Sequence, residues 1–369
     1  MSRESRQRFR AEAKRQETWL VRRGKLFRWL SVLGIVLIAV GAFAAIHFQS
    51  QKPKLIAAVQ PSQPQASTFK QPETLAQLLD LSPADLEKCD IARMNLLCAE
   101  SLPGAENLNV DDSLATLDFW AQHIKSEIDR NFHHYSEDPV YFYNSTNFYK
   151  MAMMAVVLYE DYSIRYNPKW MGAPGTEQPD DHFFADSRDI LIYGLIGDTH
   201  LGTCSSMPVL YIALGRRLGY PLKLVTTKGH LFMRWDTPTE KFDMDATSKG
   251  LNKYGDEEYK HWPFPITEQE IQEEGYLKSL TPEEELSVFL SIRGECQNDN
   301  GQLGDALASF SLAYKLVPTW KGNQVLFAEA RHRLSRPVIL AQQQQMNPNI
   351  PADPNPMQQI QPRNPFRTP

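Results

Sequence analysis

The stretch from Gly202 to Gly219, GTCSSMPVLYIALGRRLG, most limits what this chain can fold into. Its apolar residues recur about every 3.6 residues, at Val209, Leu210, Ala213, Leu214 and Leu218. Gly219 is followed by Tyr-Pro and ends the pattern, as glycine and proline end helices. We therefore predict a helix here with Cys204 in its first turn. Free backbone N–H groups and the helix dipole at that position favour a thiolate.

Three short strands are predicted directly after this helix. They cover 222–227, 230–235 and 241–245. His230 begins the second strand, and Asp243 and Asp245 lie near the end of the third. Neighbouring antiparallel strands can bring such side chains together, but alternation puts both aspartates on one face and does not choose between them. A cysteine nucleophile, a histidine base and an aspartate that orients the histidine are the groups that nucleophilic acyl transfer needs.

Three sequence blocks, GTCSSMPVLYIALGRRLG, KGHLFMRW and FDMDAT, resemble the Cys, His and Asp blocks of the transglutaminase-like superfamily. They are most similar to its bacterial branch related to the SirB1 proteins, over residues 186–250. The resemblance implies a papain-like core with Cys204, His230 and Asp245 as the catalytic triad. Asp245 is chosen over Asp243 because it precedes Ala-Thr, as the aspartate of the superfamily precedes a small residue and threonine.

The fold class we predict is α+β, with a papain-like transglutaminase core, helices before it and a helical pair after it. The function we predict is acyl transfer, in which Cys204 attacks an amide of a peptide or of a glutamine side chain. Water as acceptor gives a protease or deamidase, and a lysine amine gives crosslinking. The backbone N–H of Cys204 is one candidate oxyanion donor, and Tyr193 and Thr203 are candidates for the second. The alternative is a non-catalytic peptide- or protein-binding module. A redox thiol protein is disfavoured because the chain has no CxxC.

Charge is divided sharply along the chain. Residues 1–28 hold ten Lys or Arg and three Glu, a net of +7, so the whole-chain charge of −5 leaves −12 for the remainder. A negative remainder argues against nucleic acid as its partner.

Residues 29–48, WLSVLGIVLIAVGAFAAIHF, carry no Lys, Arg, Asp or Glu. At 1.5 Å per residue, about twenty residues span the roughly 30 Å of a bilayer core, so we predict one transmembrane helix. A signal peptide cleaved near Ala42-Phe-Ala44 is the alternative. The basic leader 1–28 then stays in the cytoplasm, and the rest is periplasmic. Residues 49–73, rich in Gln, Pro and Ser, form a linker.

Residues 74–280 are predicted to form the transglutaminase-like domain. Helices are expected to begin at Ser82-Pro83, at Asp112 or Ser113, and at Asn147, with a short one that Ser187 caps and that runs through Leu195. The loop 167–181 is placed near the substrate cleft. The aromatic loop 259–265 either walls that cleft or covers the core, and its His261 is a second candidate histidine.

Residues 287–320 resemble one tetratricopeptide repeat. The residues at its signature positions are Gly294, Ala306, Phe310, Ala313 and Pro318. With a capping helix over 324–334, a helical segment 281–335 is predicted, either as a structural support or as a docking surface for a protein partner. Residues 336–369, rich in Gln, Asn and Pro, are predicted to be a disordered tail.

The remaining cysteines and histidines predict neither a redox centre nor a metal site. In one unbroken helix, Cys89 and Cys98 would lie about 13 Å apart, beyond the roughly 7 Å limit for a disulfide. A helix break near Asp90 would allow the bond, and otherwise both are buried thiols. Cys296 has no evident partner. Because HExxH is absent, and His133 and His134 are adjacent, we predict no metal and no cofactor.

Overall fold

The computed structural model of the protein describes residues 69–171, 182–247 and 252–346. Within them the chain is α+β, as predicted. The helices are α2 (Leu75–Leu79), α3 (Pro83–Leu86), α4 (Ile91–Leu97), α5 (Val110–Arg130), α6 (His133–Glu137), α7 (Thr146–Glu160), η1 (Pro168–Trp170), α8 (Ser187–Ile190), α9 (Tyr193–Ile196), α10 (Met207–Arg217), α11 (Asp256–Tyr259), α12 (Glu268–Glu274), α13 (Pro282–Asp299), α14 (Leu303–Leu316) and α15 (Lys321–Met346). The strands are β1 (Arg165–Tyr166), β2 (Leu201–Gly202), β3 (Leu222–Thr227), β4 (His230–Asp236), β5 (Lys241–Met244) and β6 (Lys253–Tyr254).

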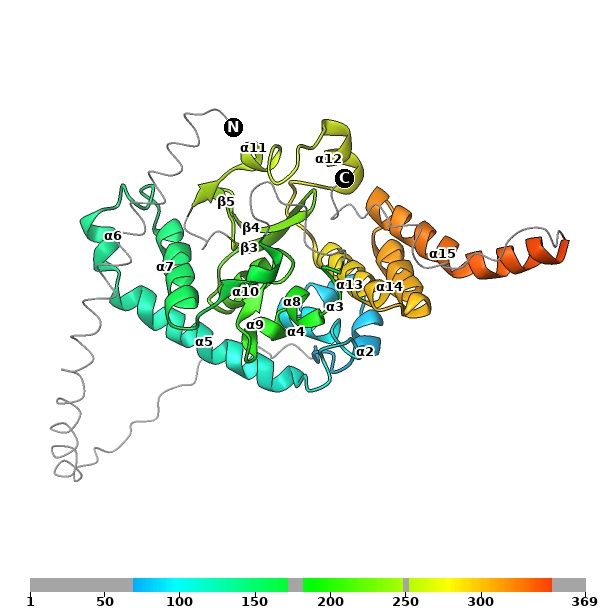
Figure 1. Ribbon diagram of the computed structural model, residues 1–369. Helices are drawn as coiled ribbons and strands as arrows, with labels where there is room; N and C mark the ends of the chain where they lie inside the picture. The colour runs from blue at the N-terminus through cyan, green and yellow to red at the C-terminus, as the bar shows by residue number, and fades with distance from the viewer. Residues whose placement is uncertain (1–68, 172–181, 248–251, 347–369) are drawn as a thin grey trace, which may run out of the picture. The chain divides into compact units, whose positions relative to one another are not determined.

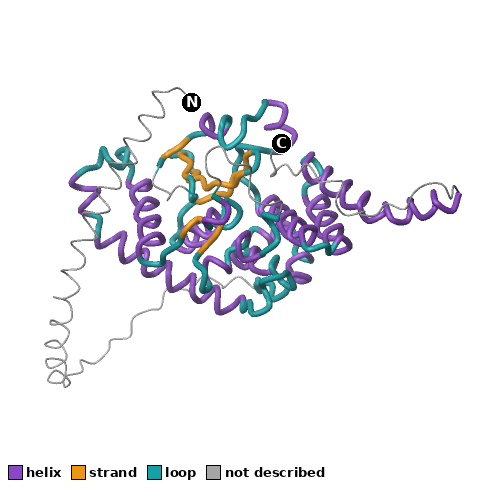
Figure 2. Tube along the Cα trace, in the orientation of Figure 1, coloured by secondary structure: helices purple, strands orange, loops and turns teal. Residues whose placement is uncertain are grey.

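An antiparallel sheet in the order β3-β4-β5-β6 forms the centre of this region (Figures 1 and 2). The three strands predicted from the sequence are confirmed, with β3 and β4 joined by a tight turn in which Gly229 takes a φ of 72°. This turn puts Thr227 opposite His230, the first residue of β4. Helix α10 packs against β3 and β4. Helices α5 and α7 lie to one side of the sheet, and α13 and α14 lie to the other (Figure 1).

Helix α10 begins later than the sequence predicts. It starts at Met207, so Cys204 lies in the turn before the helix and not in its first turn. Gly202 belongs instead to β2, which pairs in parallel with β1, and Pro208 takes one of the first two helical positions, where its missing N–H costs nothing. The predicted end is right, because Gly219 takes a φ of 75° beyond Arg217.

Among the earlier helices, the predicted start of α5 and the predicted cap of α8 are wrong, and both helices begin after side-chain caps. Helix α5 begins at Val110 because the Asn109 side chain accepts hydrogen bonds from the first backbone N–H groups. Asp186 caps α8 in place of Ser187, and the helix predicted through Leu195 is divided into α8 and α9. The predicted starts of α3, capped by Ser82, and of α7 are confirmed within one residue.

The two helices predicted near the C-terminus are present as α13 and α14. An added Cβ at Gly294 would lie 2.5 Å from the ring of Phe310, so glycine is what lets the two helices approach. Arg216 of α10 donates to the buried Glu285 of α13 at 3.0 Å, and Arg293 donates to the carbonyl of Cys98 at 2.9 Å. These bonds attach α13, the first helix of the pair, to α10 and to the end of α4.

Helix α15 continues to Met346, so the prediction of a disordered tail from Arg336 is wrong for residues 336–346. A composition that cannot form a core can still extend a helix that is already nucleated. In the parts of the chain that the structure describes, no helix is long and apolar enough to cross a membrane. The predicted leader and transmembrane helix, and residues 347–369 of the tail, lie outside the described residues.

Candidate active site

His230 and Asp245 lie side by side where β4 begins and β5 ends. The distance between His230 Nε2 and Asp245 Oδ2 is 2.7 Å, and their side chains are only 5% and 2% exposed. The second carboxylate oxygen of Asp245 accepts the backbone N–H of Thr247 at 2.7 Å and the Thr247 hydroxyl at 2.5 Å. With Nε2 turned to the carboxylate, the ring nitrogen Nδ1 is the one left for a second partner.

Asp243, the other aspartate that strand alternation allows, has a different partner. It lies opposite Arg234 in the β4–β5 ladder, and its carboxylate accepts from Arg234 Nε at 2.5 Å and from a second guanidinium nitrogen at 3.0 Å. Asp245 is therefore the residue beside the histidine, in agreement with the choice made from the Asp-Ala-Thr block.

Cys204 is held against the histidine by a hydrogen-bonded turn. The hydroxyls of Thr203 and Ser206, which flank it, both donate to the backbone carbonyl of Asp189 at 2.9 Å. The cysteine lies close enough to the His230 side chain to raise the pKa of the imidazole. The sequence therefore predicted the three members of this cluster, but it gave no sign that Asp189 fixes the turn.

Cys204 is the one cysteine that is partly exposed, since all four cysteines of the chain lie in the described residues. Cys89, Cys98 and Cys296 are buried and free, and burial raises the pKa of each thiol to about 12. The chain does break at Asp90, where α4 begins, yet no disulfide joins Cys89 to Cys98. Cys204 is thus the thiol that a reagent or substrate reaches.

The charges of the cluster stabilise a protonated histidine. Burial alone would lower the pKa of His230, but the charge and hydrogen bond of Asp245, followed by the influence of the nearby Cys204, raise it to about 10. Burial alone would raise the pKa of Asp245, but His230 and the two hydrogen bonds from Thr247 keep it below its usual value. At neutral pH the cluster therefore favours an imidazolium beside the Asp245 carboxylate.

The donors available for an oxyanion differ from those the sequence predicts. The backbone N–H of Cys204 has no hydrogen-bond partner among the described residues, so it is free to donate to a substrate oxygen. Thr203 donates its hydroxyl to Asp189, and the Tyr193 hydroxyl forms a hydrogen bond with the Ser187 hydroxyl. Because both of these hydroxyls are engaged elsewhere, neither is the second donor.

The aromatic loop 259–265 contributes to the core, one of the two purposes predicted for it, and also contacts His230. Tyr259 stacks on Phe232 with ring centroids 3.7 Å apart and covers a small core cluster. Trp262, which is 48% exposed, lies edge-to-face on the His230 imidazole at 4.7 Å and so flanks the candidate site. His261 is exposed and lies 3.3 Å from Glu257, so it does not replace His230.

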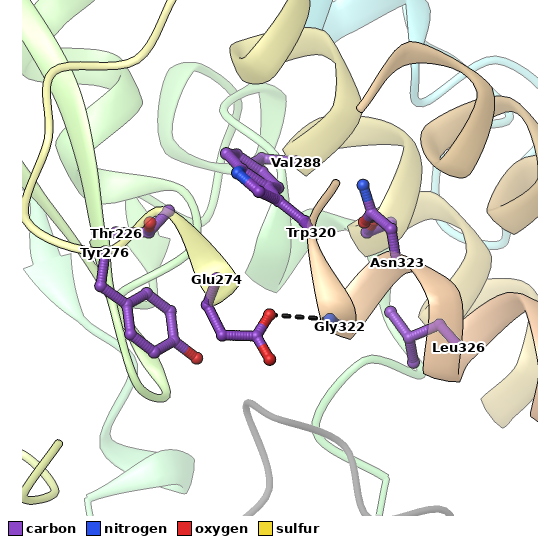
Figure 3. Close-up of a pocket in the computed structure, with 9 residues that line it drawn as sticks. Thr226, Glu274, Tyr276, Val288, Trp320, Gly322, Asn323 and Leu326 are labelled. Carbon is purple, nitrogen blue, oxygen red and sulfur yellow. Dashed lines mark hydrogen bonds between the residues drawn. The ribbon is translucent and has the colours of Figure 1, made fainter. Parts of the chain in front are cut away.

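A small cavity lies away from the cluster, where α12, α13 and the start of α15 meet β3 (Figure 3). It is lined by Thr226, Glu274, Tyr276, Val288, Ser291, Trp320, Gly322, Asn323 and Leu326. Glu274 accepts the backbone N–H of Gly322 at 2.7 Å and so caps α15. The cavity measures about 40 Å³, whereas ligand sites usually occupy about 300–1,000 Å³. It is a feature of the packing between helices and sheet and is too small for a peptide.

No group of three or more His, Cys, Asp or Glu among the described residues could hold a metal ion. Of the loop predicted near the cleft, residues 172–181 lie outside the described residues. Its beginning contacts the turn of Cys204 indirectly, because Asn167 and Trp170 both donate to the Asp189 carboxylate at 2.8 Å.

No family model matches the chain, and no curated protein or solved structure matches it either.

Proposed function

We propose that this protein is a membrane-anchored, transglutaminase-like thiol enzyme that transfers acyl groups from amides of peptides or of glutamine side chains. One observation carries the proposal. The buried His230 imidazole lies 2.7 Å from the Asp245 carboxylate and close to the partly exposed Cys204 thiol. A thiol, a base and a group that orients the base are the parts that covalent acyl transfer requires.

In the proposed reaction, Cys204 Sγ attacks the amide carbonyl carbon as a thiolate, and the π electrons of the C=O bond move to the oxygen. When the tetrahedral intermediate collapses, the C–N bond breaks and the nitrogen takes a proton from His230 Nδ1. Water or an amine then attacks the thioester, loses a proton to His230 and releases Cys204. Asp245 remains ionised and holds the ring with Nδ1 toward the sulfur.

Water as acceptor gives hydrolysis or deamidation, and a lysine amine gives a crosslink. The basic leader and the uncharged segment 29–48 support an anchored enzyme whose substrate proteins are outside the cytoplasm. The helical pair α13–α14 would then brace the catalytic part through Arg216 and Glu285, or dock a protein partner.

The test is labelling of the full-length protein in detergent with iodoacetamide across pH, followed by peptide mapping. We expect Cys204 to react fast below pH 7, and His230→Ala to slow it by at least ten-fold, because the imidazolium stabilises the thiolate. Cys296, which is buried, serves as the control thiol within the same molecule. If Cys204 reacts no faster than Cys296, or if His230→Ala leaves its rate of labelling unchanged, the proposal of an enzyme is wrong. The alternative, a non-catalytic peptide- or protein-binding module, then replaces it.

A further inference from the structure

Strand β1 carries Tyr166 beside the cysteine turn. Tyr166 pairs with Gly202 of β2, two residues before Cys204, and the pairing is parallel. The backbone N–H of Asn167 donates to the Gly202 carbonyl at 2.8 Å, and that of Arg165 donates to the His200 carbonyl at 3.0 Å. These two bonds, one on each side of Tyr166, fix its backbone relative to the segment that leads into Cys204.

A second set of bonds joins the same two segments. The Asp189 carboxylate accepts from Asn167 and Trp170, just beyond Tyr166, and the Asp189 carbonyl accepts from the hydroxyls on either side of Cys204. One residue therefore holds both the tyrosine segment and the cysteine turn. Such a rigid arrangement is what a group that acts on a developing charge needs.

The hydroxyl of Tyr166 does not hold the fold together within the described residues. It makes no hydrogen bond to any of them, and the side chain is only partly buried. Burial, and then the negative charges of Cys204 and Asp245, raise its pKa above the usual range, so the group stays protonated and can donate. Together with the pairing of Tyr166 to Gly202, two residues before Cys204, the effect of Cys204 on this pKa indicates that the tyrosine lies near the cysteine.

We infer that the Tyr166 hydroxyl is the second oxyanion donor, acting together with the backbone N–H of Cys204. The inference rests on the proposed function. When the sulfur bonds to the carbonyl carbon, an electron pair moves to the oxygen. These two donors then stabilise the negative oxygen by hydrogen bonds. The pair returns to re-form the C=O bond when the leaving group departs. Tyr166 gives up no proton in either step, so the balance of the reaction is unchanged.

Two reagents separate this role from general activation of the thiol. p-Nitrophenyl acetate acylates a thiolate through a tetrahedral oxyanion, whereas iodoacetamide alkylates it by displacement at carbon and forms no oxyanion. In the full-length protein, Tyr166→Phe should slow acylation of Cys204 by about 10²-fold, the usual loss when one oxyanion donor is removed. It should leave alkylation by iodoacetamide within two-fold of the wild type. Tyr220→Phe, which alters a partly buried tyrosine just after α10, is the matched control and should leave both rates within two-fold.

The outcomes distinguish this inference from the proposed function. If the wild-type thiol is activated through His230 and Tyr166→Phe acylates at the wild-type rate, the inference is overturned and the proposed function stands. Equal losses in both reactions would show that Tyr166 only supports the position of Cys204, which also overturns the inference. If the wild-type thiol is not activated at all, the proposed function fails and the inference fails with it.

Discussion

Two buried ion pairs link β4 to β5 and the residues just after it, and they differ in their surroundings. Arg234 and Asp243 face each other within the ladder, where Arg234 also donates to the Leu277 carbonyl at 2.9 Å and pairs with Asp256. His230 and Asp245 lie beyond the last paired residues of the β4–β5 ladder. There the imidazole has a thiol on one side and a half-exposed tryptophan against its ring.

The difference shows how one arrangement can serve two purposes. A guanidinium stays protonated, so the Arg234–Asp243 pair can only hold strands together. An imidazole exchanges its proton near neutral pH, so the same kind of pair at the end of the ladder can move a proton to or from a neighbouring thiol. We therefore expect mutations of the two pairs to affect different properties, reactivity for one and stability for the other.

The largest effect is expected when the carboxylate beside the histidine is neutralised. Asp245→Asn removes the charge that holds the imidazole protonated and oriented, and should slow the acylation of Cys204 by p-nitrophenyl acetate by 10²–10⁴-fold at pH 7. The matched control is Asp243→Asn, on the same strand. Measured on its folded fraction, it should retain a rate within three-fold of the wild type. Equal rates for the two variants would contradict the assignment of Asp245.

A large loss of stability is expected from the other pair. Arg234→Met leaves the buried Asp243 carboxylate without its bidentate partner, and should lower the free energy of unfolding by about 3–5 kcal/mol in urea titrations. The double variant Arg234→Met/Asp243→Leu removes both charges and should recover more than half of this loss. A single-variant loss below about 1 kcal/mol would show that the pair is not what holds β4 to β5.

How much of this the sequence could predict depends on how local the cause is. The strands β3 and β4 were predicted almost to the residue because Lys228-Gly229 and the 236–239 turn bound apolar runs. The sequence does not predict the start of α10 because Gly202 belongs to β2, which pairs with β1 from much earlier in the chain. A pairing between distant segments cannot be recognised from the sequence of either segment alone.

The same distinction applies to the candidate site. Cys204, His230 and Asp245 lie in short blocks that a family resemblance can pick out, and the Asp-Ala-Thr order marks the aspartate whose carboxylate Thr247 holds. Tyr166 and Asp189 are brought to Cys204 by hydrogen bonds across the fold. Neither residue belongs to a motif, so only the three-dimensional arrangement identifies them, and it also excludes Tyr193 and Thr203.

The most gradual effect is a dependence of the free energy of unfolding on pH, and it applies to one of the two pairs only. The folded-state pKa of His230 is raised from 6.5 to about 10. The stability this contributes is fully present below about pH 6.5, where the unfolded chain is protonated too, and it is lost as the pH rises toward 10. For one proton, the slope is at most about 1.4 kcal/mol per pH unit. Arg234 stays charged throughout this window.

Urea titrations between pH 6 and pH 10 check this prediction, with the Arg234→Met/Asp243→Leu double variant as the comparison. The double variant should lose stability on the alkaline side as steeply as the wild type, since it keeps His230. In Asp245→Asn the slope should become smaller, because the largest effect raising the pKa of His230 is gone. An NMR titration of the His230 ring should show the same decrease in pKa. A pKa near 6.5 for His230 in the wild type would mean that neither Asp245 nor Cys204 stabilises the protonated imidazole. The two ion pairs would then differ only in their position in the ladder.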